Sequence, residues 1–115
     1  MSKVLLHTVH TRFYSAPEES RLKILARFQQ LAEQCGGKEA GILFWNVEQE
    51  QYDTRKTDMV QIGIFRDEEA FEAFRKHPIH KKLKLELREC ADWNPGNFFP
   101  DKDKAKEMVR ALLGH

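Results

Sequence analysis

The chain has 115 residues, with 19 Lys or Arg, 18 Asp or Glu and a formal net charge of only +1. Its length suits one domain and leaves no room for a second core of ordinary size, and a charge so close to zero gives no field that would attract nucleic acid or an acidic membrane. No apolar run approaches the roughly 20 residues that cross a bilayer, and the first residues lack the apolar block of a signal peptide, so we predict no membrane partner and a cytoplasmic location.

The chain begins with a predicted strand over residues 4–13, whose side chains alternate between two faces. His7 falls on an otherwise apolar face of this strand. A capping box follows, in which the Ser15 hydroxyl is expected to accept the amide of Glu18 and so to start a helix. This helix carries an apolar stripe and is expected to end at Gly36, because glycine adopts the left-handed cap easily. Its stripe consists of Leu22, Leu25, Phe28, Leu31, Ala32 and Cys35.

The middle of the chain predicts two strands and a helix that ends abruptly. The strands cover residues 41–47 and 59–65, and the polar segment 48–57 between them reads as a mobile loop. Asp67 then stands where a helix N-cap belongs. The next proline lacks an amide hydrogen and clashes with the preceding turn, so this helix should stop or kink at His77. Two histidines are thereby placed beside a helix break, where side chains are available for chemistry.

The last third predicts a helix over 79–90, a short or bulged strand over 92–99, and a helical tail over 101–113. The complete order is βαββαβ plus a tail, the split βαβ arrangement of ferredoxin-like α+β proteins. We therefore divide the chain into a domain, residues 1–100, and a C-terminal helical tail, residues 101–115.

A sheet of this kind carries helices on one face only, so its other face needs an explanation. Both faces carry apolar side chains. On the second strand, simple alternation puts Leu43, Trp45 and Val47 on one face and Ile42 and Phe44 on the other. A bare apolar face on the order of several hundred Å² is unusual on a soluble monomer. The simplest cover is the same face of a second copy, which predicts a twofold homodimer whose two sheets pack as a barrel.

Several passages together resemble the stress-responsive A/B barrel domain, often abbreviated Dabb. The resemblance covers residues 4–99, and its family fold is a dimeric α+β barrel of ferredoxin-like protomers, in agreement with the dimer argued above. The passages that carry it are His7, Phe65-Arg66-Asp67-Glu68-Glu69-Ala70-Phe71-Glu72-Ala73-Phe74, His77-Pro78-Ile79-His80 and Asp92-Trp93.

The resemblance also implies roles for individual residues. A characterised plant member of the family closes a linear polyketide with neither a metal nor an organic cofactor. By motif its catalytic base falls at His80, and its strand-one histidine falls at His7. A tyrosine that orients the base falls at Phe74 and a second pocket tyrosine falls near Phe28, so this chain lacks both hydroxyl groups.

The two candidate catalytic residues have plainer alternative explanations. An imidazole near its neutral pKa can take a proton at physiological pH, which makes His80 the best candidate for a general base. The alternative is a histidine that caps the start of a helix. His7 would hold a substrate oxygen if its strand face lines the same cavity, and otherwise it is a hydrogen-bonded core residue.

Four further residues are candidates for ligand binding. Phe28, Trp45 and Phe74 are predicted to line an apolar pocket between the sheet and the helices, with a solid aromatic core as the alternative. His77 is the fourth candidate. Its alternative role is local, a hydrogen bond to a backbone carbonyl freed at the helix end.

Sequence motifs give no reason to expect a metal or an organic cofactor. The chain has no HExxH motif, no Cys/His cluster and no dinucleotide or phosphate-binding glycine loop. Its two cysteines, Cys35 and Cys90, form no CxxC unit and are expected to be free thiols.

Three functions stay open. The first is a homodimer that binds a small apolar or aromatic molecule and, in its enzymatic form, acts as a cofactor-free cyclase or lyase with His80 as base. The second is a non-enzymatic stress or interaction protein with a filled core. The third is a cofactor-free monooxygenase of the antibiotic-biosynthesis type, which shares the dimeric barrel.

Overall fold

The structure is a computed structural model that describes residues 3–52 and 57–114. It confirms the predicted α+β, ferredoxin-like βαββαβ order with a C-terminal helix. The elements are β1 (Leu5–Phe13), α1 (Glu18–Gln34), the short 3₁₀ helix η1 (Gly37–Ala40), β2 (Ile42–Gln49), β3 (Met59–Phe65), α2 (Glu68–Lys76), α3 (Pro78–Arg88), β4 (Ala91–Phe98) and α4 (Lys102–Leu113).

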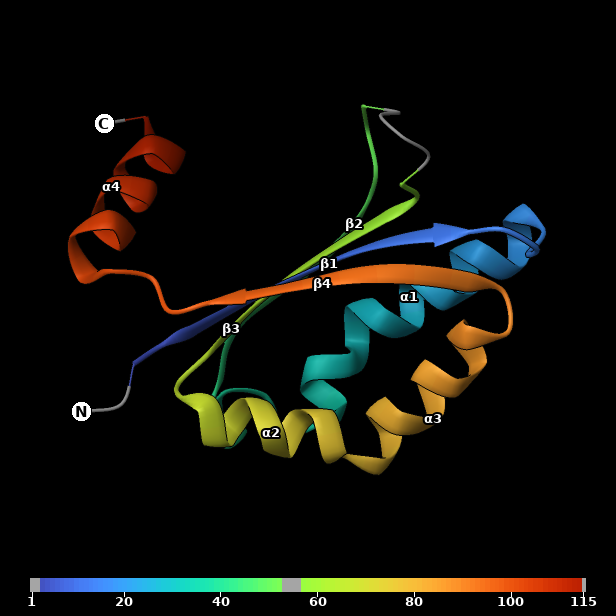
Figure 1. Ribbon diagram of the computed structural model, residues 1–115, viewed down its shortest axis with the longest axis horizontal. Coiled ribbons are helices and arrows are strands. Elements are labelled where there is room, and N and C mark those ends of the chain that lie inside the picture. Colours follow the sequence, from blue (N-terminus) through green and yellow to red (C-terminus); the bar gives the residue numbers. More distant parts are fainter. Residues whose placement is uncertain (1–2, 53–56, 115) are drawn as a thin grey trace.

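The four strands form one antiparallel sheet in the order β2-β3-β1-β4. Helices α1, α2 and α3 lie on one side of this sheet, and α4 lies on the other side (Figure 1). Strand β1 is therefore flanked on both edges, by β3 and by β4. In its register His7 pairs with Gly63 on one side and with Asn97 on the other, which places a histidine near the centre of the helix-covered face.

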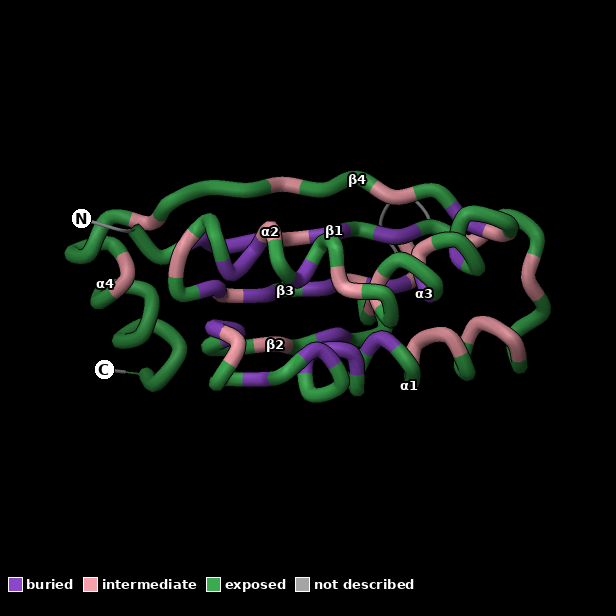
Figure 2. Tube along the Cα trace, turned by 90° about the horizontal axis from the view of Figure 1, so that it is seen from below, coloured by how far each residue is buried: buried purple, intermediate pink, exposed green. Residues whose placement is uncertain are grey.

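The core lies in the layer between the sheet and helices α1–α3. Phe65 at the end of β3 and Leu31 on α1 are fully buried, and the aromatic rings of Phe71 and Phe74 each lie 5.1 Å from the ring of Phe65. Both phenylalanines stand on one face of α2, three residues apart, as the helical repeat requires. Burial is concentrated in the central strands and is sparse along β4 and α4 (Figure 2).

The alternation predicted for the second strand is wrong at its start, because β2 contains a bulge. Ile42 pairs with Phe65 and Phe44 pairs with Ile64, so Leu43 is an extra residue in the ladder. This residue turns Ile42 to the helix-covered face, where it is buried, and leaves Phe44 on the open face. Simple alternation of side chains along a strand cannot indicate such an extra residue.

The capping box predicted for the first helix is also wrong. Pro17 is the N-cap residue of α1, which begins at Glu18, and no side chain caps it. The Ser15 hydroxyl instead donates a hydrogen bond to the Glu89 carbonyl, and the Ser15 amide bonds the carbonyl of Cys90. Both contacts hold this segment against the turn before β4, so the serine is not free to cap.

The predicted loop over 48–57 lies partly outside the described residues. Its first two residues, Glu48 and Gln49, belong to β2. The ladder is closed by a hydrogen bond from the Glu50 amide to the Asp58 carbonyl, so the second strand is longer than its sequence pattern indicates.

The predicted helix break is confirmed. Asp67 caps α2 by accepting a hydrogen bond from the Ala70 amide at 2.8 Å. The helix ends at Lys76, and α3 begins at once with Pro78 as its first residue. His77 between them is extended, with φ −62° and ψ 134°. The break directs α3 back along the sheet and sets its first turn over the central strands.

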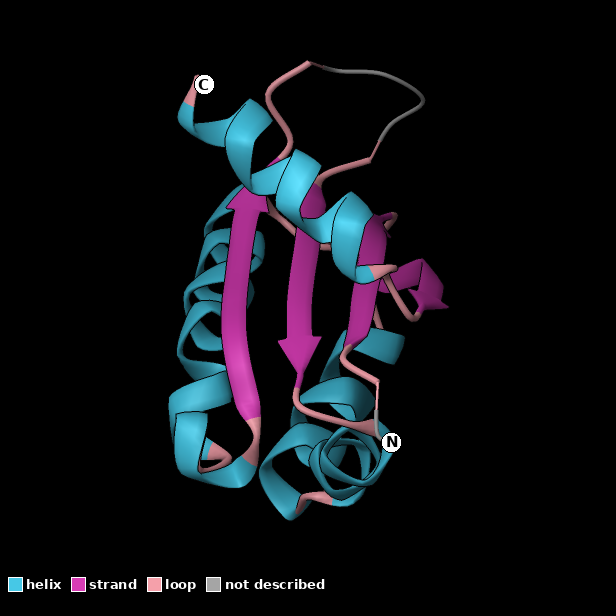
Figure 3. Cartoon of the chain, turned by 90° about the vertical axis from the view of Figure 1, so that its left-hand side faces the viewer, coloured by secondary structure: helices cyan, strands magenta, loops and turns pink. Residues whose placement is uncertain are grey.

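The open face of the sheet is apolar at one end. Phe44, Ile62 and Phe98 lie on it with 49%, 36% and 48% of their surface exposed. Helix α4, on the same side, buries none of its residues and stands apart from α1–α3 in both views (Figures 1 and 3). No helix in the described part of the chain is both long and apolar enough to span a bilayer.

Candidate functional site

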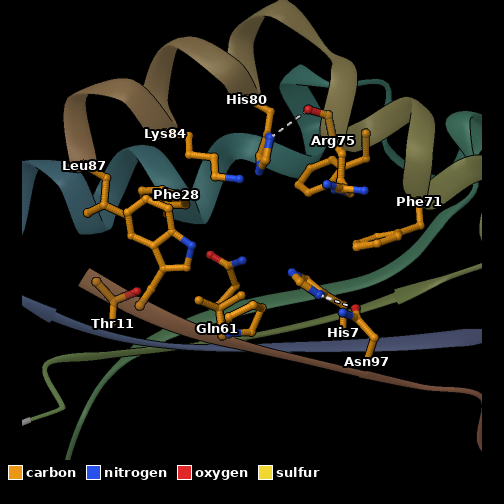
Figure 4. Close-up of a pocket in the computed structure, with 14 residues that line it drawn as sticks. His7, Thr11, Phe28, Gln61, Phe71, Arg75, His80, Lys84, Leu87 and Asn97 are labelled. Carbon is orange, nitrogen blue, oxygen red and sulfur yellow. Dashed lines mark hydrogen bonds between the residues drawn. The ribbon is translucent and has the colours of Figure 1, made fainter. Parts of the chain in front are cut away.

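A cavity of about 310 Å³ lies between the helix-covered face of the sheet and helices α1–α3. Strands β1, β3 and β4 form its floor, and α2 and α3 form its roof (Figure 4). Both catalytic candidates, His80 and His7, lie in its wall. Its volume is at the lower end of the range for small-molecule sites. The filled core expected for a non-enzymatic protein is therefore absent from this part of the fold.

His80 enters the cavity from the first turn of α3. Its Nδ1 lies 3.3 Å from the backbone carbonyl oxygen of Arg75. A carbonyl oxygen only accepts hydrogen bonds, so Nδ1 must carry the proton and Nε2 must carry the lone pair. The ring packs against Phe74, with ring centres 4.6 Å apart. The Arg75 carbonyl thus fixes the tautomer of a ring whose aromatic neighbour has no hydroxyl.

His7 enters the same cavity from the central strand β1. Its Nδ1 lies 2.6 Å from Oδ1 of Asn97 on β4, and its ring packs against Phe71 with centres 4.9 Å apart. With the amide oxygen as acceptor, Nδ1 donates, and the other ring nitrogen faces the cavity (Figure 4). The structure therefore brings His7 and His80 to one space, each held through Nδ1.

Burial governs the charge of both imidazoles. The pKa of His80 is lowered from 6.5 to about 4, chiefly by burial and to a smaller extent by the positive charges of Lys84 and Arg75. Burial is also the largest cause of the lowered pKa of His7, and the same two cations add to it. Both rings are consequently neutral at pH 7 and available as proton acceptors.

Acidification should therefore destabilise the fold through these two histidines. In the unfolded chain an imidazole titrates near 6.5, whereas folded His80 stays neutral down to about pH 4. Their contribution to the free energy of unfolding is complete above pH 6.5 and is lost as the pH falls towards 4, because only the unfolded state gains protons there.

Urea unfolding at pH 7.5, 5.5 and 4.5 should show a weaker pH dependence of the free energy of unfolding for His80→Gln than for the wild type. Equal slopes for wild type and His80→Gln would contradict this prediction.

Two cations and two buried polar residues complete the cavity, and sequence reasoning missed all four. They are Arg75, Lys84, Thr11 and Gln61. A signal existed for Lys84, which follows His80 by four residues and so shares its helix face. A signal existed for Thr11 too, since it follows His7 by four residues on one strand face. The other two depend on which strands and helix ends are neighbours in space.

Two of the predicted ligand-binding residues, Phe28 and Phe74, line this cavity. Trp45 lies behind it, where its ring packs on Phe74 at 5.2 Å and its Nε1 donates to the Phe28 carbonyl at 2.8 Å. The tryptophan thus supports the wall instead of forming it.

His77 also lies outside the cavity walls. Its Nδ1 accepts a hydrogen bond from the Ile79 amide at 3.1 Å and caps the start of α3. The predicted bond to a carbonyl of the preceding helix is therefore wrong in direction. Pro78 is the reason: a helix that begins on proline still leaves the next amides without partners, and a neutral imidazole nitrogen can accept one.

Within residues 3–52 and 57–114, no group of three or more His, Cys, Asp or Glu side chains is arranged to hold a metal ion. Cys35 is buried and Cys90 is half-buried, and both are free thiols, as predicted. Burial raises the pKa of each, so both are weak nucleophiles.

The fold has well-matched structural neighbours of low sequence identity. A dimeric ferredoxin-like protein of unknown function from Thermobifida fusca superposes with a TM-score of 0.74 at 13% identity, covering 87% of this chain and 93% of that chain. Hydroxynitrile lyase from Passiflora edulis gives a TM-score of 0.73 at 14% identity, covering 89% and 97%. SnoaB, a cofactor-independent oxygenase from Streptomyces nogalater, gives 0.68 at 17%, covering 88% and 96%.

No protein-family model matches the chain, and no curated protein matches it. At identities this low the structural likeness shows the fold alone. The ferredoxin-like architecture is thus shared with proteins that include a lyase, an oxygenase and dimers of unknown function, while membership of the stress-responsive A/B barrel family stays a prediction.

Proposed function

We propose that this protein is a homodimer of the stress-responsive A/B barrel type, with residues 1–100 as the domain and 101–115 as its tail. It binds a small aromatic or apolar molecule in the cavity beside His80. His80 acts as a general base on the bound molecule, in a cyclase-like or lyase-like reaction that uses neither a metal nor an organic cofactor.

The hydrogen bond between His80 Nδ1 and the Arg75 carbonyl carries this proposal. It leaves Nε2 as the nitrogen with the lone pair, on a ring that lines a cavity of ligand size. A general base needs a fixed position and a free lone pair before its pKa matters. Both requirements are met here without the tyrosine hydroxyl that the family resemblance places at Phe74.

The reaction class follows from the groups in the cavity. Nε2 of His80 would take a proton from an acidic C–H or O–H of the ligand, and the electron pair left behind would form an enolate or phenolate. The free nitrogen of His7 can accept a hydrogen bond from a second ligand hydroxyl and hold that group in place. Aromatic walls from Phe28 and Phe71 suit a flat, unsaturated ligand.

A second candidate function is favoured by the low basicity of the same residue. A pKa of about 4 makes His80 in the empty cavity a weak base, and catalysis is most efficient when this value lies near the working pH. The protein would then bind its ligand without transforming it.

Proton exchange in D₂O separates the two functions. Wild-type protein is incubated with a panel of aryl ketones and aryl β-keto esters, and proton NMR follows deuterium entry next to the carbonyl. A general base predicts saturable exchange, faster than that in an equal concentration of free imidazole. Binding without faster exchange for every panel member would overturn the catalytic proposal and leave a binding protein. Oxygen uptake with electron-rich phenols, measured in parallel, would assign the oxygenase alternative instead.

The homodimer is supported by the open face of the sheet. Its apolar end carries Phe44 on β2, Ile62 on β3 and Phe98 on β4, and each is more than a third exposed. Two of these side chains are aromatic, and an exposed apolar surface of this kind is unusual on a protein that stays monomeric. A twofold axis through the face would bury the same residues from both protomers.

A further inference from the structure

Thr11 has an unexplained hydroxyl in the floor of the cavity. Its side chain is 1% exposed, and Oγ1 has no hydrogen-bond partner. Leaving a buried hydroxyl unpaired destabilises a folded protein, so such a group usually has a partner that is not part of the chain. Because Thr11 lines the cavity, a molecule bound there would lie beside this hydroxyl.

Lys84 places a positive charge in the same part of the cavity. It projects from α3, one turn beyond His80, with Nζ 5.7 Å from the centre of the Trp93 ring. Trp93 pairs with Thr11 across the β1–β4 ladder, so the ring beside the lysine belongs to the strand neighbour of Thr11. None of the ion pairs formed by the described residues includes Lys84.

Gln61 supplies a third polar group. It lies on β3 opposite Val9 of β1, and Val9 is two residues from Thr11 along that strand. The side chain of Gln61 is 4% exposed. Its carboxamide and the Lys84 ammonium point into the cavity from opposite walls, floor and roof (Figure 4). A glutamine beneath three helices, at a site otherwise suited to an apolar residue, is costly to bury unless its amide has a partner.

From this convergence we infer that Thr11, Gln61 and Lys84 form a carboxylate-binding subsite, so that the ligand of the cavity is a small aromatic carboxylate. The inference rests on the proposed function only in that the cavity is a ligand site.

The three side chains together offer what a carboxylate requires. Lys84 contributes a full charge with three donors, Gln61 two amide hydrogens and Thr11 one hydroxyl hydrogen. No Asp or Glu is among the residues that line the cavity in the described part of the chain, so nothing there repels an anion. A carboxylate accepts about four hydrogen bonds, and those from charged donors are the strong ones.

The other cation, Arg75, is already engaged. Its Nη1 donates to Oε1 of Glu72 at 2.8 Å, and its guanidinium lies 5.8 Å from the centre of the Phe71 ring. The net attraction for an anion is consequently greatest at Lys84. With the carboxylate there, the aromatic part of the ligand would extend beneath His80 towards His7.

An anion in this position would also improve His80 as a base. Besides burial, which is the larger cause, the charge of Lys84 lowers the pKa of His80. A bound carboxylate would offset that charge and move the pKa back towards the working pH. The low pKa of His80 thus describes the protein without its ligand.

The test compares aromatic acids with their own amides, which differ little in shape. Cinnamate and cinnamamide, and 2-naphthoate and 2-naphthamide, are titrated into ¹⁵N-labelled protein, and backbone shifts of β1 and α3 give the dissociation constants. We expect each acid to bind about tenfold or more tightly than its amide. In Lys84→Met the preference should disappear through weaker binding of the acid. Lys82→Met, an exposed change on α3 outside the cavity, should leave it intact.

Thr11→Val supplies a second variant with opposite expected effects. Removing an unpaired hydroxyl should raise the melting temperature of the ligand-free protein, while the affinity for the acid should fall. A purely structural role for Thr11 predicts a lower melting temperature and no change in affinity.

The outcomes separate this inference from the proposed function. Equal binding of acids and amides, or an unchanged preference in Lys84→Met, overturns the carboxylate subsite while the cavity remains a ligand site. Absence of binding by both members of every pair at millimolar concentration overturns the subsite and the aromatic ligand together. Acid binding without exchange catalysis supports the subsite and removes only the catalytic role of His80.

Discussion

Replacing His80 with glutamine is expected to lower the exchange rate of bound carbon acids by about 10²–10⁴-fold, the usual contribution of a positioned general base. Glutamine preserves side-chain bulk and hydrogen bonding at a half-buried position, but it cannot take a proton at neutral pH. The dissociation constant should change much less than the rate, because the base acts in the transition state. Rates from NMR exchange and affinities from titration, measured on the same sample, would give both quantities.

His77→Asn is the matched control for this substitution. Residue 77 belongs to the same helix break but lies outside the cavity walls, and asparagine can still accept the Ile79 amide as an N-cap. Its exchange rate should equal that of the wild type. If His80→Gln kept the full rate, or if His77→Asn lost as much activity, the base would not be His80.

Replacing Ile62 with lysine is expected to convert the proposed dimer to monomers. Ile62 lies on β3, in the middle of the open face and 36% exposed in the protomer. In a twofold interface each substitution occurs twice, so two ammonium groups would have to be buried against an apolar surface. The dissociation constant of the dimer should rise about 100-fold or more, since an unpaired charge in an apolar interface costs several kcal/mol. Sedimentation equilibrium at micromolar concentration measures this directly.

The control for the interface is Leu85→Lys. Leu85 is 59% exposed on α3, on the helical side of the protomer, so the same charge there should leave the dimer unchanged. The circular dichroism of both variants should match the wild type, because neither residue belongs to the core. A wild-type protein that sediments as a monomer would contradict the dimer itself.

The sequence was sufficient for those features that depend on local chemistry. Alternation and helical spacing predicted the βαββαβ order, and the pair Asp67 and Pro78 predicted where α2 begins and ends. The bulge at Leu43 and the engagement of Ser15 with Glu89 were not predictable in this way. Both depend on contacts between segments that are distant in the chain.

The candidate site was likewise predictable only in part from the sequence. The break predicted that His80 would be free of a regular helix interior, but its tautomer is fixed by the Arg75 carbonyl, which no residue pattern reveals. Thr11 and Lys84 were not predicted as site residues, because a threonine in a strand and a lysine in a helix are common and indicate no function by themselves. Their significance arises from the register of β1 with β4 and the position of α3 above it.

Strand β1 contributes side chains to both faces of the sheet. His7 and Thr11 project into the cavity, whereas Leu6 and His10 project to the open face, one residue out of phase. Insertion or deletion of a single amino acid within this strand would exchange the two sets, putting the imidazole outside and the contact residues within. We therefore expect natural variants to change β1 by point substitution and to confine differences in length to the connections between elements. If the proposed dimer and ligand site are both correct, a single indel in β1 would therefore damage both of them.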